Sequence, residues 1–178
     1  MILFINTCVR PESRTLRLAK KVLENIRNCG EIIEVRPNNK PLDNSTLEYR
    51  TQLISKSNYE DPIFDDAKIF ARADKIVIAA PYWDLSFPAS LKNYIEAINI
   101  TGLTFGYTNE GRPYGLCKAQ ELIYVTTAGG FITSGAYGYG YIKELAGTFY
   151  GIPEISCIKA EGLDIIGADV EDILSRAL

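Results

Sequence analysis

Residues 75–80 read Lys-Ile-Val-Ile-Ala-Ala and are followed directly by Pro81. An apolar run this short, stopped by a proline, is typical of a strand that is buried on both faces of a parallel sheet. Four further short apolar runs are predicted as strands, at residues 2–5, 32–35, 121–127 and 155–160. A segment with helical spacing follows each strand, which indicates βαβ units. Because crossovers between parallel strands are right-handed, we expect a three-layer, doubly wound α/β fold with a five-stranded parallel sheet.

Apolar residues at helical spacing predict the helices around this sheet. Six helices are expected: residues 13–30, a helix opened at 45–48, residues 61–72, a helix after Pro88, a helix ending near 150–151, and residues 168–177. Gly30 is the predicted end of the first helix, and Ser45-Thr46-Leu47-Glu48 is a capping box that opens the second. Segments 102–115 and 135–140 are predicted as loops, the latter flexible and aromatic. With no linker or repeat, residues 1–178 are expected to form one domain.

The composition excludes several classes of function. The chain has 178 residues, is 47% hydrophobic and 23% charged, carries a net charge of −3 and contains no histidine. Without histidine there is no Ser–His–Asp or Cys–His nucleophile system, no HExxH zinc site and no imidazole proton relay. No basic stripe offers a footprint for phosphate backbones, so we expect no nucleic-acid partner.

The cysteines and the longest apolar run indicate in which cellular compartment the protein is expected. Cys8, Cys29, Cys117 and Cys157 are dispersed without metal-ligand spacing, which favours reduced thiols and no metal site. The longest apolar stretch is far shorter than the ~18 residues that a membrane span needs. Met1 leads straight into a predicted strand, without the pattern of a signal peptide. These features predict a cytoplasmic protein that does not associate with membranes.

Ligands of an open parallel sheet bind beyond the carboxyl ends of its strands, so the segments there are candidates for chemistry. After the first strand, residues 6–15 supply hydroxyls, two arginines and the N–H groups of a helix N-terminus, which suit either an anion site or an ordinary capped loop. After the third strand, the proline-bounded loop 81–88 carries the sole Trp and is either a wall for a planar ligand or aromatic packing. After the fourth strand, residues 126–130 end in two glycines, which allow close approach of a ligand or simply make a turn.

These three segments meet at one edge of the predicted sheet. A phosphate end, an aromatic wall and a glycine turn together suit a phosphorylated flat heterocycle. None of them is a GxGxxG or GxxxxGK[ST] loop, so neither a dinucleotide fingerprint nor a P-loop is predicted.

The middle of the chain resembles a known family. Residues 81–96, PYWDLSFPASLKNYIE, are similar to the P-M-W/Y-N-F-x-x-P-x-x-L-K-x-Y-I/F-D segment of the flavodoxin-like NAD(P)H:quinone oxidoreductases, a family that includes the FMN-dependent azoreductases. Residues 102–111, GLTFGYTNEG, resemble the family's G-x-T-F-x-Y-T-x-x-G loop, and residues 126–130 resemble its T-S-R-G-G turn. Residues 13–15 match the S-x-S/T that receives the FMN phosphate. The chain departs from the pattern at Cys8, Tyr82, Asp84 and Ala128, where the family usually has Ser, Met, Asn and Arg.

The resemblance implies a flavodoxin-like sheet with strand order 2-1-3-4-5 and a bound FMN. The FMN-binding positions that it implies are Thr7, Arg10, Ser13, Arg14, Thr15, Pro81, Tyr82, Trp83, Asp84, Leu85, Thr127, Ala128, Gly129 and Gly130. Phe105 and Tyr107 are expected to line the substrate pocket. No catalytic side chain and no metal are expected, because the flavin carries the chemistry.

The implied activity is a ping-pong transfer of two electrons, taken as hydride from NADH or NADPH and passed to a small quinone or azo acceptor. The resemblance also implies a homodimer with FMN sites at its interface. The alternatives are a flavodoxin-type electron carrier and a flavin reductase that serves a dedicated partner. A carrier is less favoured, because such proteins are typically more acidic and contain a T-x-T-G-x-T phosphate loop that this chain lacks. The sequence selects neither the natural acceptor nor NADH over NADPH.

Overall fold

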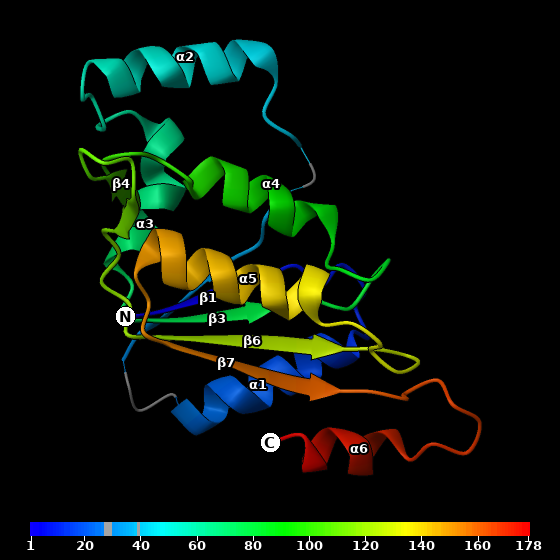
Figure 1. Cartoon of the computed structure of the whole chain (residues 1–178). Coiled ribbons are helices and arrows are strands. Elements are labelled where there is room, and N and C mark those ends of the chain that lie inside the picture. The colour runs from blue at the N-terminus through cyan, green and yellow to red at the C-terminus, as the bar shows by residue number, and fades with distance from the viewer. Residues whose placement is uncertain (27–29, 39) are drawn as a thin grey trace.

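Five parallel strands form the central sheet of the computed structural model, which describes residues 1–26, 30–38 and 40–178 (Figure 1). In sheet order they are β2 (Ile32–Val35), β1 (Ile2–Asn6), β3 (Lys75–Ala79), β6 (Glu121–Thr127) and β7 (Glu154–Ala160). Numbered among themselves along the chain, these strands have the order 2-1-3-4-5. The predicted α/β fold class and strand order are therefore confirmed.

The register aligns the carboxyl ends of β1 and β3, and β6 extends two residues beyond them to Thr127. Asn6 pairs with Ala79, and Ala79 pairs with Val125. Every residue of β1 is buried, and so is every residue of β3 and β6 except the first, whereas β2 at the edge alternates between exposed and half-buried residues. Because the central strands are covered on both faces, polar side chains are placed where the strands end.

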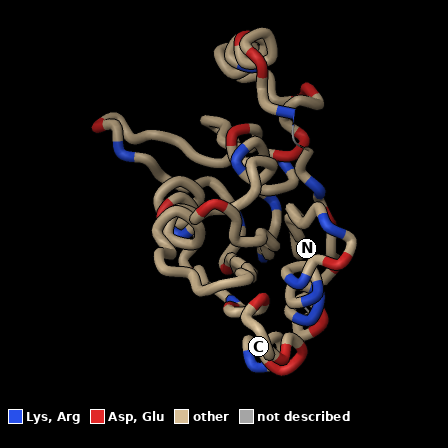
Figure 2. The backbone as a smooth tube through the Cα atoms, turned by 90° about the vertical axis from the view of Figure 1, so that its right-hand side faces the viewer, with Lys and Arg blue, Asp and Glu red and all other residues tan. Residues whose placement is uncertain are grey.

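Two helical layers cover the sheet (Figure 1). One face carries α1 (Arg14–Ile26) and α6 (Val170–Arg176), and the other carries α3 (Asp65–Arg72), α4 (Ala89–Ile98) and α5 (Tyr141–Leu145). Successive strand residues point to opposite faces, so Ile2 and Phe4 pack with α1 while Leu3 and Ile5 belong to the core under α3, α4 and α5. Figure 2 shows both signs of charge spread over the molecule, and an ion pair between Arg17 and Glu171 joins α1 to α6.

Helix α2 (Asn44–Ser55) lies outside these layers and buries none of its residues (Figure 1). The guanidinium of Arg50 on α2 donates to the carbonyl of Glu96 at 2.7 Å. The predicted capping box is wrong: Asp43 is the N-cap and accepts from the N–H of Thr46 at 2.8 Å, while Ser45 donates its hydroxyl to Asp43. These hydrogen bonds lower the pKa of the Asp43 carboxyl to about 2.

The helix predicted over 61–72 begins as a 3₁₀ turn, Pro62–Phe64, which Asp61 caps, and continues as α3. The last helix begins at Val170 after its cap Asp169, two residues later than predicted. The first helix is described as far as Ile26; residues 27–29, which include Cys29 and precede the predicted end at Gly30, lie outside the described residues. No described helix is long and apolar enough to cross a membrane.

Two segments predicted as loops have regular structure. Within 102–115, β4 (Phe105–Tyr107) and β5 (Pro113–Gly115) form an antiparallel hairpin. Residues Ala136–Gly140 form a π-helical turn that runs into α5, and a second π-helical turn, Ala146–Tyr150, follows it before Gly151 ends the helix in the left-handed conformation. The prediction of a flexible loop at 135–140 is therefore wrong, because the backbone of this segment is hydrogen-bonded, as between the N–H of Gly140 and the carbonyl of Gly135 at 2.7 Å.

The hairpin packs directly on the end of this helix, which gives a test of the fold. A Cβ at Gly115 would overlap the backbone of Tyr150 and Gly151, and backbone cannot move aside as a side chain does. We expect Gly115→Ala to lower the free energy of unfolding by about 2 kcal/mol or more, as overpacking does. Gly135→Ala is the control, because its Cβ would meet nothing within 4 Å. Equal urea midpoints for the two variants would contradict this packing.

Candidate functional site

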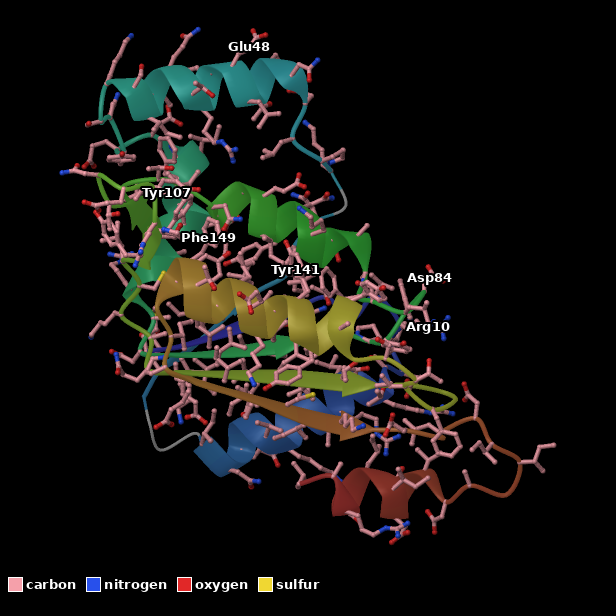
Figure 3. All side chains as sticks on the ribbon, in the orientation of Figure 1. Arg10, Glu48, Asp84, Tyr107, Tyr141 and Phe149 are labelled. Atoms are coloured by element: carbon pink, nitrogen blue, oxygen red, sulfur yellow. The ribbon has the colours of Figure 1, made fainter. Side chains whose placement is uncertain are left out.

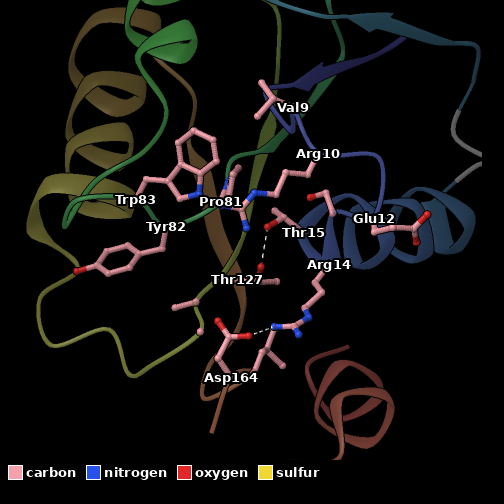
Figure 4. A pocket seen from close by; sticks show the side chains of 14 residues that line it. Val9, Arg10, Glu12, Arg14, Thr15, Pro81, Tyr82, Trp83, Thr127 and Asp164 are labelled. Carbon is pink, nitrogen blue, oxygen red and sulfur yellow. Dashed lines mark hydrogen bonds and ion pairs between the residues drawn. The ribbon is translucent and has the colours of Figure 1, made fainter.

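A cavity of about 480 Å³ lies at the carboxyl edge of the sheet, where the segments after β1, β3, β6 and β7 meet (Figure 4). It is lined by Val9, Arg10, Glu12, Ser13, Arg14, Thr15, Pro81, Tyr82, Trp83, Thr127, Ala128, Gly129, Leu163 and Asp164. Its volume lies within the roughly 300–1,000 Å³ of typical small-molecule sites.

One end of the cavity is built from the N-terminus of α1. Ser13 precedes the helix and accepts a hydrogen bond from the N–H of Leu16 at 3.2 Å, which makes it the N-cap. The hydroxyls of Thr15 and Thr127 lie 2.7 Å apart and join the helix to the end of β6. With the guanidinium groups of Arg10 and Arg14, this end supplies positive charge, hydroxyls and a helix dipole, the features that bind anions.

Arg14 is already held in place by a carboxylate. Its Nη1 lies 2.5 Å from Oδ1 of Asp164, which follows β7. Both side chains are partly exposed, so the pair stabilises the fold only slightly. The contact keeps the guanidinium at the cavity wall (Figure 4).

The opposite wall is the aromatic segment after β3. Trp83 and Ser86 exchange two backbone hydrogen bonds, of 3.1 and 2.7 Å, around a two-residue turn. Both residues of that turn, Asp84 (φ 50°) and Leu85 (φ 65°), have positive φ without being glycine. Such strain persists only where the surroundings fix it and is concentrated at functional sites. Here the hydroxyl of Ser86 donates to the carbonyl of Tyr137 at 2.6 Å and anchors the turn.

The glycine turn after β6 is bound to the segment after β7. The N–H of Asp164 donates to the carbonyl of Gly129 at 2.9 Å, and the N–H of Leu163 donates to that of Ala128 at 3.2 Å. A Cβ at Gly129 would overlap the carboxylate of Asp164. A side chain at position 129 would therefore push the carboxylate of Asp164 away from its present position.

The structure brings together most of the sequence-predicted FMN-binding residues. Ten of the fourteen line the cavity: Arg10, Ser13, Arg14, Thr15, Pro81, Tyr82, Trp83, Thr127, Ala128 and Gly129. Thr7 is buried and donates its hydroxyl to the carbonyl of Ala79 at 2.8 Å, so it holds the loop to β3. Asp84, Leu85 and Gly130 are neighbours of lining residues but are not part of the lining.

Sequence reasoning missed four lining residues: Val9, Glu12, Leu163 and Asp164. The last two follow β7, so the rule that points to strand ends would have found them had it been applied to the fifth strand.

Phe105 and Tyr107, the predicted substrate residues, are not brought to this cavity. They lie on the β4–β5 hairpin beside Phe149, far from Arg10 and Asp84 (Figure 3). The ring centroids of Phe105 and Phe149 are 4.7 Å apart, and Tyr107 is half exposed.

The described thiols and acidic groups offer no other chemistry here. Burial raises the pKa of the Cys8 thiol, which therefore stays protonated. Cys8, Cys117 and Cys157 form no disulfide. Within the described ranges, no three His, Cys, Asp or Glu side chains are grouped so that they hold a metal ion.

A doubly wound sheet of this strand order, with a ligand-sized cavity at its switch point, defines the class of flavodoxin-like α/β proteins. The chain belongs to the family described as having the flavodoxin-like fold, which it matches over residues 1–178.

Two bacterial proteins are similar to this chain over nearly its whole length. The FMN-dependent NADH:quinone oxidoreductase 2 of Clostridium acetobutylicum is 36% identical over 189 residues, which cover 99% of this chain and 94% of that protein. The FMN-dependent NADH:quinone oxidoreductase of Coprothermobacter proteolyticus is 36% identical over 177 residues, which cover 94% of this chain and 88% of that protein.

Solved structures show the same fold at lower identity. An azoreductase from Bacillus anthracis str. Sterne superimposes with a TM-score of 0.79 at 22% identity and covers 99% of this chain and 93% of its own. An FMN-dependent NADH-azoreductase from Bacillus anthracis str. Ames Ancestor, solved in complex with FMN, gives a TM-score of 0.74 at 20% identity, with coverage of 99% and 92%.

Proposed function

We propose that the protein is an FMN-dependent oxidoreductase that takes electrons from NADH and passes them to a quinone. The observation that carries this proposal is the single cavity that joins an anion-binding end to an aromatic wall at the sheet's switch point. The full-length similarity to proteins named FMN-dependent NADH:quinone oxidoreductases supports it.

The donor groups of the cavity fit FMN. Arg10, Ser13, Arg14 and Thr15 suit its phosphate, because charged guanidinium groups and hydroxyls bind phosphate oxygens strongly. Trp83 supplies an aromatic surface for a flat ring. The backbone N–H groups of Asp84 and Leu85, which lie next to the lining, donate to no backbone carbonyl among the described residues and would be free for the polar edge of the ring.

When bound, FMN supplies the two-electron chemistry, since it exchanges hydride with nicotinamides and electrons with quinones. The chain's own part is to bind and orient. The α1 end would hold the phosphate, and the segment from Pro81 to Leu85 would hold the ring. No side-chain base is needed for this role, in agreement with a sequence that contains no histidine.

We further propose a homodimer, as expected from the resemblance. Tyr107 lies away from the cavity of its own chain, so it lines a substrate pocket only if a second copy presents its hairpin there, whereas Phe105 is buried against Phe149 and supports the hairpin from within. Tyr107 is half exposed at the tip of that hairpin and is available for such a contact.

Flavin retention and reduction test the function directly. Protein mixed with FMN and desalted is expected to keep its flavin absorbance, to bleach with anaerobic NADH and to recover on adding benzoquinone. Retained bands that no pyridine nucleotide bleaches would favour an electron carrier or a reductase with a dedicated partner. Loss of all flavin on desalting would leave the fold but remove the basis of the proposal.

The phosphate end is tested by comparing FMN with riboflavin, which lacks the phosphate. Arg14→Ala is expected to weaken FMN binding about tenfold, because a charge-assisted hydrogen bond contributes roughly 1.5–3 kcal/mol. Riboflavin affinity should change less than about twofold. Arg17→Ala is the matched control, since Arg17 also lies on α1 and also pairs with a carboxylate, that of Glu171, but lies outside the cavity. Equal losses of affinity for FMN and for riboflavin would show that the phosphate binds away from Arg14.

The aromatic wall is tested by Trp83→Ala. We expect FMN and riboflavin to bind about tenfold more weakly, because contact between aromatic rings contributes roughly 1 kcal/mol beyond the buried area. Fluorescence titration of the flavin measures both affinities. Tyr49→Ala, a change to an exposed aromatic residue on α2, should leave them unaltered. Unchanged affinity in the Trp83 variant would show that the ring lies away from this segment.

A further inference from the structure

A second cavity, of about 270 Å³, lies next to the first but on the other side of the sheet. Its floor is formed by β6 and β7, and the glycine-rich π-helical turn that leads into α5 covers it. Thr127 lines the first cavity and Thr126 lines the second, because successive residues of a strand point to opposite faces. Tyr82 is the one residue that lines both.

Two hydroxyls in this cavity have no partner. Tyr124 is 1% exposed and Thr126 is 3% exposed, and neither side-chain oxygen makes a hydrogen bond of good geometry with the described residues, although the Thr126 hydroxyl lies near enough to lower the pKa of Tyr124 against the effect of burial. They are two residues apart on β6 and face the same way. Leaving a buried hydroxyl unpaired is costly, so these two groups indicate that something polar belongs between them.

The other polar groups around the cavity are already engaged. The hydroxyl of Tyr139 donates to the carbonyl of Ile155 at 2.9 Å, and the ammonium of Lys159 pairs with Glu161 at 2.9 Å. Burial raises the pKa of the Cys157 thiol to about 11, so it is uncharged at neutral pH. Burial also raises the pKa of Tyr124, which keeps its proton for donation. The site therefore offers a ligand two neutral hydroxyls and no free charge.

The remaining surface is aromatic. The rings of Tyr124 and Tyr139 are 6.1 Å apart between centroids and tilted by 33°, and Tyr82 forms a further wall. An apolar cavity of about 150 Å³ is enough to bind benzene, so this one accommodates a substituted single ring. One hydroxyl on such a ring both accepts a hydrogen bond and donates one, which matches the two unpaired groups.

From this we propose that the cavity between β6, β7 and the turn at 136–140 is a separate binding site for a neutral one-ring phenol. The phenol's oxygen accepts from Tyr124 and donates to Thr126, and its ring packs against the tyrosines. This site is distinct from the proposed FMN cavity, with which it shares Tyr82 alone among the described lining residues.

The experiment titrates phenol and toluene into the protein by calorimetry, with and without saturating FMN. We expect one phenol per chain in both cases. Tyr124→Phe should weaken phenol binding about fivefold or more, as loss of one hydrogen bond does, while toluene affinity changes less than about twofold. This contrast separates a hydrogen-bonding role from a merely structural one.

A blocking variant gives the second arm. A Cβ at Gly138 would lie 3.8 Å from the hydroxyl oxygen of Tyr124, so Gly138→Ala adds a methyl group inside the cavity without a clash. This variant should bind both phenol and toluene more weakly. Gly147→Ala is the matched control, because its Cβ would also make only an ordinary contact, 3.8 Å from Ile155, and lies outside the cavity. No saturation with phenol up to about 10 mM would overturn the proposal, as would displacement of phenol by FMN or equal affinity of the Tyr124 variant.

Discussion

The register between β1, β3 and β6 is the constraint on which the site depends. The pairing of Asn6 with Ala79 and of Ala79 with Val125 makes β1 and β3 end at the same level, and β6 continues two residues further, to Thr127. Each chain segment that leaves the sheet there contributes one part of the cavity: the helix N-terminus, the aromatic turn and the glycine turn. A one-residue slip of β6 that brought Ala128 to the position of Thr127 would remove the hydroxyl that contacts Thr15.

The sequence predicts the strands well because their environment leaves a plain signal. A strand buried on both faces needs apolar residues throughout, and residues 76–80 meet that requirement after the half-buried Lys75. The hairpin at 105–115 leaves no such signal. Its strands are three residues long and contain Gly106, Pro113 and Gly115. They are held by packing on the end of the helical unit at Tyr150 and Gly151, which comes about 35 residues later in the chain.

The site residues that stand in recognisable loop motifs were predicted from the sequence. Those that reach the site through a contact between distant parts of the chain were missed. Ser13, Trp83 and Gly129 stand in recognisable loops. Asp164 has no motif around it, and its importance follows only from its contact with Arg14 across 150 residues of chain. The positive φ of Asp84 and Leu85 could not be predicted from the sequence either, because neither residue is glycine and no motif there indicates this conformation.

The contact between Arg14 and Asp164 also shows how such a cavity is prepared for an anion. An arginine beside a helix N-terminus is drawn toward any negative charge, and here a carboxylate of the same chain supplies it at 2.5 Å. Exposed pairs of this kind contribute only about 0–1 kcal/mol, because water and salt screen them. A phosphate carries up to twice the charge of a carboxylate and can bind the guanidinium, the hydroxyls and the helix N–H groups together. In the proposed function, the internal pair orients Arg14 at small cost and would release it to a phosphate, whereas an unpaired arginine would have to be ordered when the ligand binds.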